Sequence, residues 1–169
     1  MMILKPYKGK TPTLDESAHA FEGAILIGDV TLKKDVGVWY NSTLRGDMAP
    51  IFIDEGANVQ DNAVIHTDTD QPTHIGKRVT IGHSAIVHAA TVNDDSLIGM
   101  GSIILNGATV EENGFVAAGA IVPPGKTVKS KTLVAGNPAR EIKTLNDRDI
   151  QGIKENGEAY IELLKTHYK

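Results

Sequence analysis

The stretch RVTIGHSAIVHAATVNDDSLIGMGS, residues 78–102, carries a short repeat that decides the fold. Aliphatic residues recur in it every five or six positions, at Ile81, Val87, Val92 and Ile98. A short fixed period is typical of solenoids, in which units stack because none can bury its apolar face alone. The stretch therefore predicts a stack of short, similar units rather than a fold built from long strands.

The same period continues in both directions along the chain. Each unit begins with an aliphatic residue and usually has a small or β-branched residue at its fifth position, with Met48 and Lys126 as exceptions. The aliphatic positions are Leu26, Leu32, Val38, Leu44, Ile53, Val59, Ile65, Ile75, Ile81, Val87, Val92, Ile98, Ile104, Val110, Val116, Val122, Val128 and Val134. The fifth positions are Val30, Val36, Ser42, Ala57, Ala63, Val79, Ala85, Thr91, Ser96, Ser102, Ala108, Gly114, Ala120 and Thr132.

Each unit is predicted to form one short strand followed by a bend. Its aliphatic residue points inward, and the small fifth residue lets the chain turn without crowding. Three strands close one triangular coil, and coils stack at the strand spacing of about 4.8 Å. A sandwich or barrel would need longer strands of alternating polarity joined by hairpins, which the sequence lacks. We therefore predict an all-β solenoid, a parallel β-helix of hexapeptide repeats, over residues 1–140.

The period of six ends with the segment LVAGNPAREI, and residues 141–169 are predicted to form a C-terminal helix packed alongside the β-helix. Asn146 is a suitable N-cap, with acidic residues in the first turn after it. The apolar residues that recur at helical spacing are Ile150, Ile153, Ile161 and Leu164.

The composition narrows the function classes. With 41% hydrophobic and 22% charged residues among 169, an ordered globular fold is expected. A net charge of −4 gives no electrostatic footprint for nucleic acid, and the absence of cysteine excludes disulfides and thiolate metal ligands. The sequence shows neither a signal peptide nor a segment long enough to cross a bilayer, so a cytoplasmic protein without a membrane partner is expected.

The register places two histidines on one face of the predicted prism. His66 and His88 each directly follow an inward aliphatic residue, and they are three units apart once the extra residues of the loop TDTDQPTH are set aside. Three units make one coil, so the two side chains stack and can share a metal ion, because zinc binds imidazole nitrogens at about 2.0–2.1 Å. His83 is the third residue of another unit and lies on a different face. A third ligand must therefore come from a neighbouring subunit.

Other side chains stack in line with these histidines, one coil above or below them. Arg45 lies beneath the stacked pair, Asp61 lies beneath the third histidine, and Met100 lies above it. Asp61 is placed to orient that histidine, and Arg45 is expected to form an ion pair across the subunit interface, with Asp47 or Asp61. Gln60 could be functional or part of a polar ladder. The histidines expected to be ordinary surface residues are His19, His74 and His167.

Five segments together resemble the γ-class carbonic anhydrase family over nearly the whole chain. They are LRGDMAPI (44–51), NVQDNAVIH (58–66), TIGHSAIVHAATV (80–92), LIGMGSIILNGA (97–108) and VAGNPAREI (134–142). The resemblance implies a left-handed β-helix, a homotrimer with three sites at its interfaces, and reversible hydration of carbon dioxide to bicarbonate.

The resemblance also implies individual roles. His66, His83 and His88 would bind Zn²⁺, although Fe²⁺ or Co²⁺ also accepts three imidazoles. Such a site leaves one position for water, whose pKa falls to about 7, so that a metal-bound hydroxide would attack carbon dioxide. The other predicted site residues are Gln60 and Asp61 as an active-site polar pair, Arg45 and Asp47 as an interface ion pair, Tyr160 reaching from the helix, and Met100 and Asn106 lining the site.

The sequence departs from the best-studied branch of that family at its proton shuttle. That branch has a glutamate directly after its R-x-D segment and a second in a longer acidic loop. Here Met48 follows Asp47 and the loop is the short TDTDQPT. Hydration is therefore expected to be weak.

Two other functions stay open. A hexapeptide-repeat acyltransferase using acetyl-CoA would need a single catalytic histidine, and the basic segment GKTVKSKT could contact cofactor phosphates. However, Lys126, Lys129 and Lys131 could equally form a solvated face. A non-catalytic trimer that binds a metal or a small anion would explain the missing shuttle.

Overall fold

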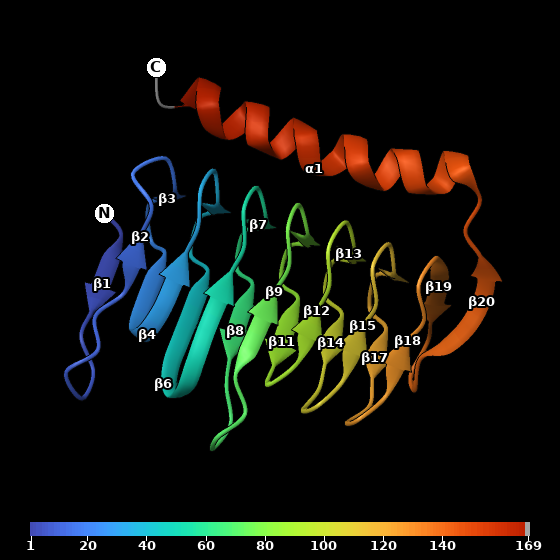
Figure 1. Cartoon of the computed structure of the whole chain (residues 1–169), viewed down its shortest axis with the longest axis horizontal. Coiled ribbons are helices and arrows are strands. Elements are labelled where there is room, and N and C mark those ends of the chain that lie inside the picture. Colours follow the sequence, from blue (N-terminus) through green and yellow to red (C-terminus); the bar gives the residue numbers. More distant parts are fainter. Residues whose placement is uncertain (168–169) are drawn as a thin grey trace.

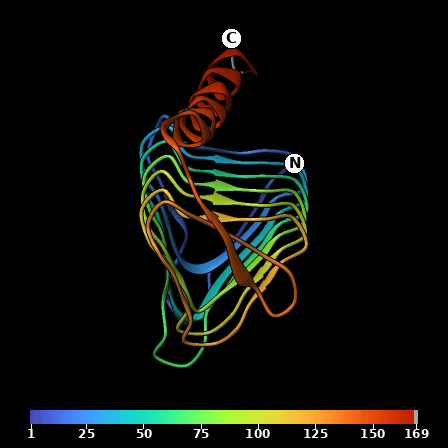
Figure 2. The same ribbon diagram turned by 90° about the vertical axis from the view of Figure 1, so that its right-hand side faces the viewer.

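A computed structural model describes residues 1–167 and shows a stack of about seven coils with one long helix along its side (Figure 1). Viewed along the stack, the coils have a roughly triangular outline (Figure 2). The predicted fold class, a β-solenoid with a C-terminal helix packed alongside, is confirmed.

Most strands are two or three residues long, because each unit turns after one inward residue. The elements are β1 (Ile3–Lys5), β2 (Thr13–Leu14), β3 (His19–Ala20), β4 (Ile25–Leu32), β5 (Gly37–Val38), β6 (Thr43–Ile53), β7 (Asn58–Val59), β8 (Val64–His66), β9 (Thr73–Ile75), β10 (Thr80–Ile81), β11 (Ile86–His88), β12 (Thr91–Val92), β13 (Leu97–Ile98), β14 (Ile103–Ile104), β15 (Thr109–Val110), β16 (Phe115–Val116), β17 (Ile121–Val122), β18 (Thr127–Val128), β19 (Thr132–Ala135), β20 (Arg140–Thr144) and α1 (Asp147–His167).

The strands pair in parallel with the strands one coil before and one coil after them. Val87 pairs with Ile65 on one side and Ile104 on the other, and Ile81 lies between Val59 and Ile98 in the same way. The one antiparallel pair among the named strands joins β19 to β20 at the end of the stack. Three units per coil, as the sequence predicted, are therefore confirmed.

The core consists of the predicted inward residues. All of the aliphatic positions are buried, and Val134, at the end of the stack, is the most exposed of them at 7%. Burying each such side chain is worth about 1.5–3 kcal/mol. The stack is therefore held together mainly by one continuous column of Ile, Leu and Val.

One predicted fifth-position residue is wrong. The unit that starts at Val87 is one residue short, and Ala90 rather than Thr91 takes the buried place, with 2% exposure. Ala89 turns the corner with a φ of 48°, a conformation that L-residues seldom adopt. The tighter corner brings Thr91 to the start of β12, where it is half-buried.

Two irregularities interrupt the coils. In β6, the pairing with β4 shifts between Gly46 and Ile51, so residues 47–50 bulge from the ladder. The second irregularity is the loop between β8 and β9, which projects from the prism (Figures 1 and 2). Both irregularities lie beside the predicted metal ligands.

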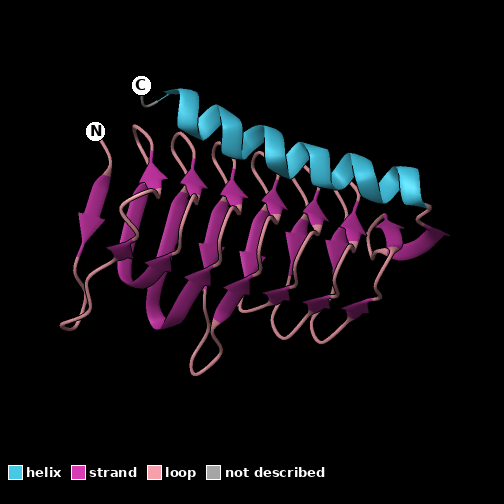
Figure 3. Ribbon diagram, turned by 45° about the horizontal axis from the view of Figure 1, so that its top comes forward, coloured by secondary structure: helices cyan, strands magenta, loops and turns pink. Residues whose placement is uncertain are grey.

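The strands β20-β19-β16-β13-β10-β7-β5-β3 form one face of the prism, and α1 covers it (Figure 3). The other faces hold β17-β14-β11-β8-β6 and β6-β9-β12-β15-β18, because the long strand β6 pairs with both β8 and β9. The third predicted ligand follows β10, whereas the first two lie on β8 and β11. The structure therefore separates them as predicted.

The helix begins at the predicted cap. The Asn146 side chain accepts a hydrogen bond from the Asp149 backbone N–H (3.0 Å), and the Asp149 carboxylate accepts one from the Asn146 N–H (3.1 Å). Ile153 and Leu164 are buried against the prism. Residues 141–144, which were predicted to be helical, belong to β20 instead. Residues 168–169 lie outside the described residues, and the domain division at residue 140 stays a prediction. Within residues 1–167, no helix has the length and apolar character needed to cross a bilayer.

Candidate metal centre

His66 and His88 face each other across adjacent strands. The register pairs them directly, and Nδ1 of His66 lies 3.0 Å from Nε2 of His88. Two nitrogens bound to one tetrahedral zinc ion are about 3.3 Å apart, given zinc–nitrogen distances of about 2.0–2.1 Å. The stacked pair therefore has the spacing of one edge of a metal tetrahedron.

The outer nitrogen of each ring faces an oxygen acceptor. Nε2 of His66 lies 3.0 Å from Asp47 Oδ1, and Nδ1 of His88 lies 2.8 Å from Asn106 Oδ1. Carboxylate and amide oxygens can only accept, so both outer nitrogens carry hydrogen. In the neutral rings the inner nitrogens then both present lone pairs, and these repel unless a proton or a metal cation joins them. This donor set fits a metal ion.

Asp47 carries negative charge toward the pair. Burial favours the neutral acid, but hydrogen bonds from His66 and Arg45 outweigh it and lower the pKa of Asp47. Nη1 of Arg45 donates to Asp47 Oδ2 within one chain. Arg45 lies directly beneath His66 in the ladder, as the register predicted. The bulge at residues 47–50 is what turns Asp47 toward the imidazole.

His83 lies on the face that α1 covers. Its Nδ1 is 2.7 Å from Asp61 Oδ2, so the predicted contact with Asp61 is present. The carboxylate accepts from Nδ1, which leaves the lone pair of the neutral ring on Nε2. The His83 backbone N–H donates to Gln60 Oε1 at 3.2 Å. The imidazole is 41% exposed, and it is therefore open to a ligand from outside the chain.

A cavity of about 320 Å³ lies beside His83, between the prism and α1. Tyr160 and Met100 line it, and so do the apolar side chains Leu97 and Phe115. Burial, and secondarily the charge of Asp61, raises the pKa of the Tyr160 hydroxyl. Tyr160 and Met100 therefore accompany His83, whereas Asn106 accompanies His88.

Gln60 is held by hydrogen bonds at both ends of its amide. In addition to the contact with His83, its Nε2 donates to Asn58 Oδ1 at 3.2 Å. Asn58 in turn donates to Thr80 Oγ1 (2.9 Å), which donates to Asn156 on α1 (3.1 Å). The sequence did not predict that Asn58 and Asn156 would belong to this hydrogen-bond chain. Asn58 could have been noticed as a polar residue beside an inward aliphatic, but Asn156 enters through the docking of the helix, which the repeat does not specify.

Within residues 1–167, no group of three or more histidine or carboxylate side chains is arranged to hold a metal ion. One chain thus carries the predicted metal ligands in two separate places, a pair on β8 and β11 and a single histidine after β10.

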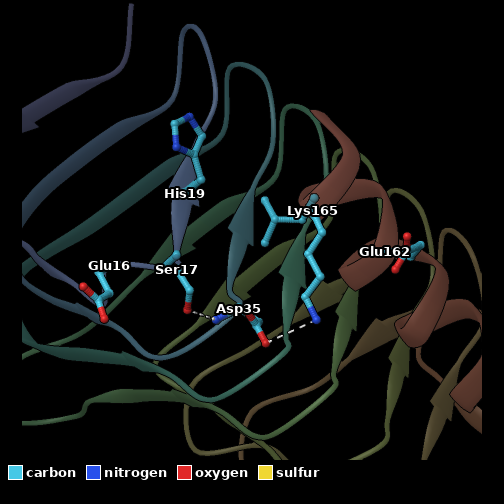
Figure 4. Close-up of a pocket in the computed structure, with 8 residues that line it drawn as sticks. Glu16, Ser17, His19, Asp35, Glu162 and Lys165 are labelled. Atoms are coloured by element: carbon cyan, nitrogen blue, oxygen red, sulfur yellow. Dashed lines mark hydrogen bonds and ion pairs between the residues drawn. The ribbon is translucent and has the colours of Figure 1, made fainter. Parts of the chain in front are cut away.

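A second cavity, of about 540 Å³, lies between residues 16–19 and the last turns of α1 (Figure 4). Ser17 Oγ accepts a hydrogen bond from the Asp35 backbone N–H (3.0 Å), and Lys165 lies 3.7 Å from the Asp35 carboxylate. The Lys165 contact links the end of the helix to the coils, and the Ser17 contact joins two neighbouring coils. The residues that line this second cavity are Glu16, Ser17, Ala18, His19, Asp35, Glu162, Leu164 and Lys165. The predicted site residues all lie elsewhere.

Comparison with curated proteins gives relatives over almost the full chain. A carbonic anhydrase from Geobacillus kaustophilus is 43% identical over 160 residues, covering 95% of this chain and 88% of the relative. The mitochondrial gamma carbonic anhydrase 2 of Arabidopsis thaliana is 38% identical over 164 residues, covering 94% of this chain and 59% of the relative. No protein-family model matches the chain.

Solved structures share the fold closely. A hexapeptide transferase family protein from Anaplasma phagocytophilum is 42% identical with a TM-score of 0.94, and the match covers 97% of both chains. A putative acetyltransferase from Bacillus cereus is 35% identical with a TM-score of 0.97, covering 98% of this chain and 96% of that one.

Proposed function

The chain belongs to the γ-class carbonic anhydrase family, and from that premise we propose that it catalyses the reversible hydration of carbon dioxide to bicarbonate. The observation that carries the proposal is the facing pair of His66 Nδ1 and His88 Nε2, 3.0 Å apart. Both rings are held so that lone pairs converge, which is the arrangement that binds a cation and otherwise costs free energy.

We propose Zn²⁺ as the metal, with Fe²⁺ and Co²⁺ as alternatives. His66 and His88 of one chain and His83 of the partner subunit would hold it, in a homotrimer with one site at each interface. Exposed apolar side chains support contact between subunits, because Met100 (58% exposed) stacks above His83 and Val64 (38% exposed) lies on the strand of His66. A zinc ion bound there would polarise a water molecule and lower its pKa.

The chain's own residues orient the ligands and bind the substrate. Asp47, supported by Arg45, holds the His66 ring, and Asp61 holds the His83 ring. The apolar part of the cavity beside His83 suits an uncharged molecule such as carbon dioxide. Gln60, tied to Asn58 and to the His83 backbone, positions the segment that carries His83.

Proton removal is expected to be the slow step of the reaction. Met48, which is 49% exposed, stands where the family's best-studied branch has a carboxylate. A thioether cannot carry a proton, so the proton must leave directly to the solvent or a buffer. Slow turnover follows from this substitution.

An acyltransferase is the second candidate, because close solved structures carry transferase names. A cavity of about 350 Å³ at the end of the stack is lined by Lys126, Lys129 and Arg140, which could contact the phosphates of acetyl-CoA. A non-catalytic trimer that binds a metal or a small anion is the third candidate. The acyltransferase does not explain why two imidazoles should face each other with lone pairs. A metal-binding trimer shares that arrangement and differs from the enzyme only in lacking hydration activity.

Metal analysis followed by stopped-flow measurement of carbon dioxide hydration tests the proposal. Full zinc occupancy with background hydration would favour the non-catalytic trimer. Binding of acetyl-CoA by metal-free protein would favour the acyltransferase.

A further inference from the structure

The loop between β8 and β9 is pinned at both of its ends. The Thr67 hydroxyl accepts a hydrogen bond from the Ala49 backbone N–H (3.2 Å), and the Thr73 hydroxyl donates to the His66 carbonyl (2.5 Å). Both threonines are fully buried. Near the tip, Asp68 and Gln71 exchange two backbone hydrogen bonds, at 3.2 and 3.0 Å. Asp68 is therefore held in a defined place although it lies in an insertion.

Both carboxylate oxygens of Asp68 are used. Oδ1 accepts from the Thr69 backbone N–H (2.7 Å), and Oδ2 accepts from Asn106 Nδ2 (2.6 Å). A carboxylate only accepts, so the amide NH₂ of Asn106 must face it. The amide oxygen is consequently turned the other way, to 2.8 Å from His88 Nδ1.

We propose that Asp68, acting through Asn106, fixes His88 in the tautomer with hydrogen on Nδ1 and the lone pair on Nε2. Asp68 is thus a positioning residue for a metal ligand, and this role rests on the proposed function. An amide with no carboxylate behind it can turn over and offer NH₂ to Nδ1. The hydrogen would then move to Nε2, the atom that faces His66.

The two irregularities of the repeat have the same effect, because each of them brings a carboxylate into position to orient a histidine ring. The bulge at residues 47–50 brings a carboxylate directly to His66, and the loop brings one to His88 through a single amide. Groups that fix ring orientation in this way typically change metal affinity by about 10- to 100-fold when they are removed.

The substitution Asp68→Asn tests the inference. The remaining side-chain oxygen keeps the contact with Thr69, and the new NH₂ faces Asn106, which then turns its oxygen toward residue 68. We expect His88 to shift to the tautomer with hydrogen on Nε2. ¹⁵N NMR of the histidine side chains in metal-free protein, above the pH at which the rings are protonated, measures this directly. Asp70→Asn is the matched control, because Asp70 lies exposed in the same loop and should leave the tautomer unchanged.

Zinc affinity, measured by competition with a chelator, provides a second readout. Asp68→Asn should weaken binding about 10- to 100-fold, Asp70→Asn should not, and Asp68→Asn should add nothing in an Asn106→Leu background. An unchanged His88 tautomer in Asp68→Asn, an equal change in Asp70→Asn, or additive effects in the double variant would overturn the inference. If the unsubstituted protein bound no metal, the proposed function would fail, and the NMR comparison would still decide the tautomer.

Discussion

His66 and His88 lie on adjacent coils with their inner nitrogens 3.0 Å apart, and each ring is turned that way by an acceptor behind it, Asp47 in one case and Asn106 in the other. Two hydrogen bonds, to Asp47 and to Asn106, therefore hold the lone pairs of the inner nitrogens toward each other when the rings are neutral. Folding alone gives no reason for this arrangement, whereas binding a cation does.

Zinc should raise the melting temperature of the protein, because a ligand that binds only the folded state stabilises it, by about 2.7 kcal/mol at a free concentration 100 times the Kd. A chelator should reverse the shift. Differential scanning fluorimetry checks this, with His66→Ala expected to show no response. His74→Ala is the control, since His74 pairs with Asp54 (2.8 Å) away from the site, and it should respond like the unsubstituted protein. An undiminished shift in His66→Ala would contradict the assignment.

Turnover should depend on the buffer. With Met48 in place of a carboxylate, proton removal limits the hydration rate. Adding imidazole at constant pH and ionic strength should therefore raise kcat several-fold and leave kcat/KM nearly unchanged. A rate independent of imidazole would mean that some residue of the chain moves the proton. Met48→Glu should raise kcat in dilute buffer and reduce its dependence on imidazole.

Gly82 should not tolerate a side chain. A Cβ there would lie 2.8 Å from the carbonyl oxygen of Ile98 and from the backbone N of Met100. Gly82→Ala must push adjacent coils apart next to His83, so we expect a loss of about 1–3 kcal/mol of stability together with weaker metal binding. Gly152→Ala is the comparison, because a Cβ on that helical residue meets nothing within 4 Å, and it should stabilise by about 0.5–1 kcal/mol. Chemical denaturation measures both. A Gly82→Ala protein of full stability would disprove the close stacking.

The helix cap should weaken in acid. Hydrogen bonds from Lys143 and from the Asn146 backbone lower the pKa of Asp149 below its ordinary value of 3.8. Its contribution to stability is present above the unfolded-state pKa and is lost as pH falls through the lowered folded-state pKa. Asp149→Asn should therefore melt below the unsubstituted protein at pH 7, and the difference should shrink below about pH 3.8. A constant difference across this range would show that charge at Asp149 is unimportant.

The repeat register made much of the fold predictable. Counting three units per coil was enough to pair His66 with His88 and to place Asp61 beneath His83, because stacking repeats one geometry along the chain. The Asn146 cap was also predictable, because a helix cap depends on residues only three positions apart in the sequence.

The support around the ligands was less predictable. The contact of Asp68 with Asn106 joins a loop insertion to a coil above it, and Asn156 reaches Thr80 only because α1 docks where it does. Neither contact follows the period of six. The burial of Ala90 in place of Thr91 shows a related limit. The spacing of five from Val87 to Val92 indicates that this unit is one residue short, but it does not indicate which position of the unit is missing.

Each proposed metal site is assembled from two chains, so two variants that each lack one ligand should complement each other when they are mixed. His66→Ala and His83→Ala should each bind no metal when refolded alone, because each lacks a ligand at every interface. Unfolded together in equal amounts and refolded, they should recover about one quarter of the metal bound by the unsubstituted protein, since random trimers join an intact pair to an intact His83 at that frequency. Metal binding by either variant alone, or no recovery in the mixture, would contradict the shared site.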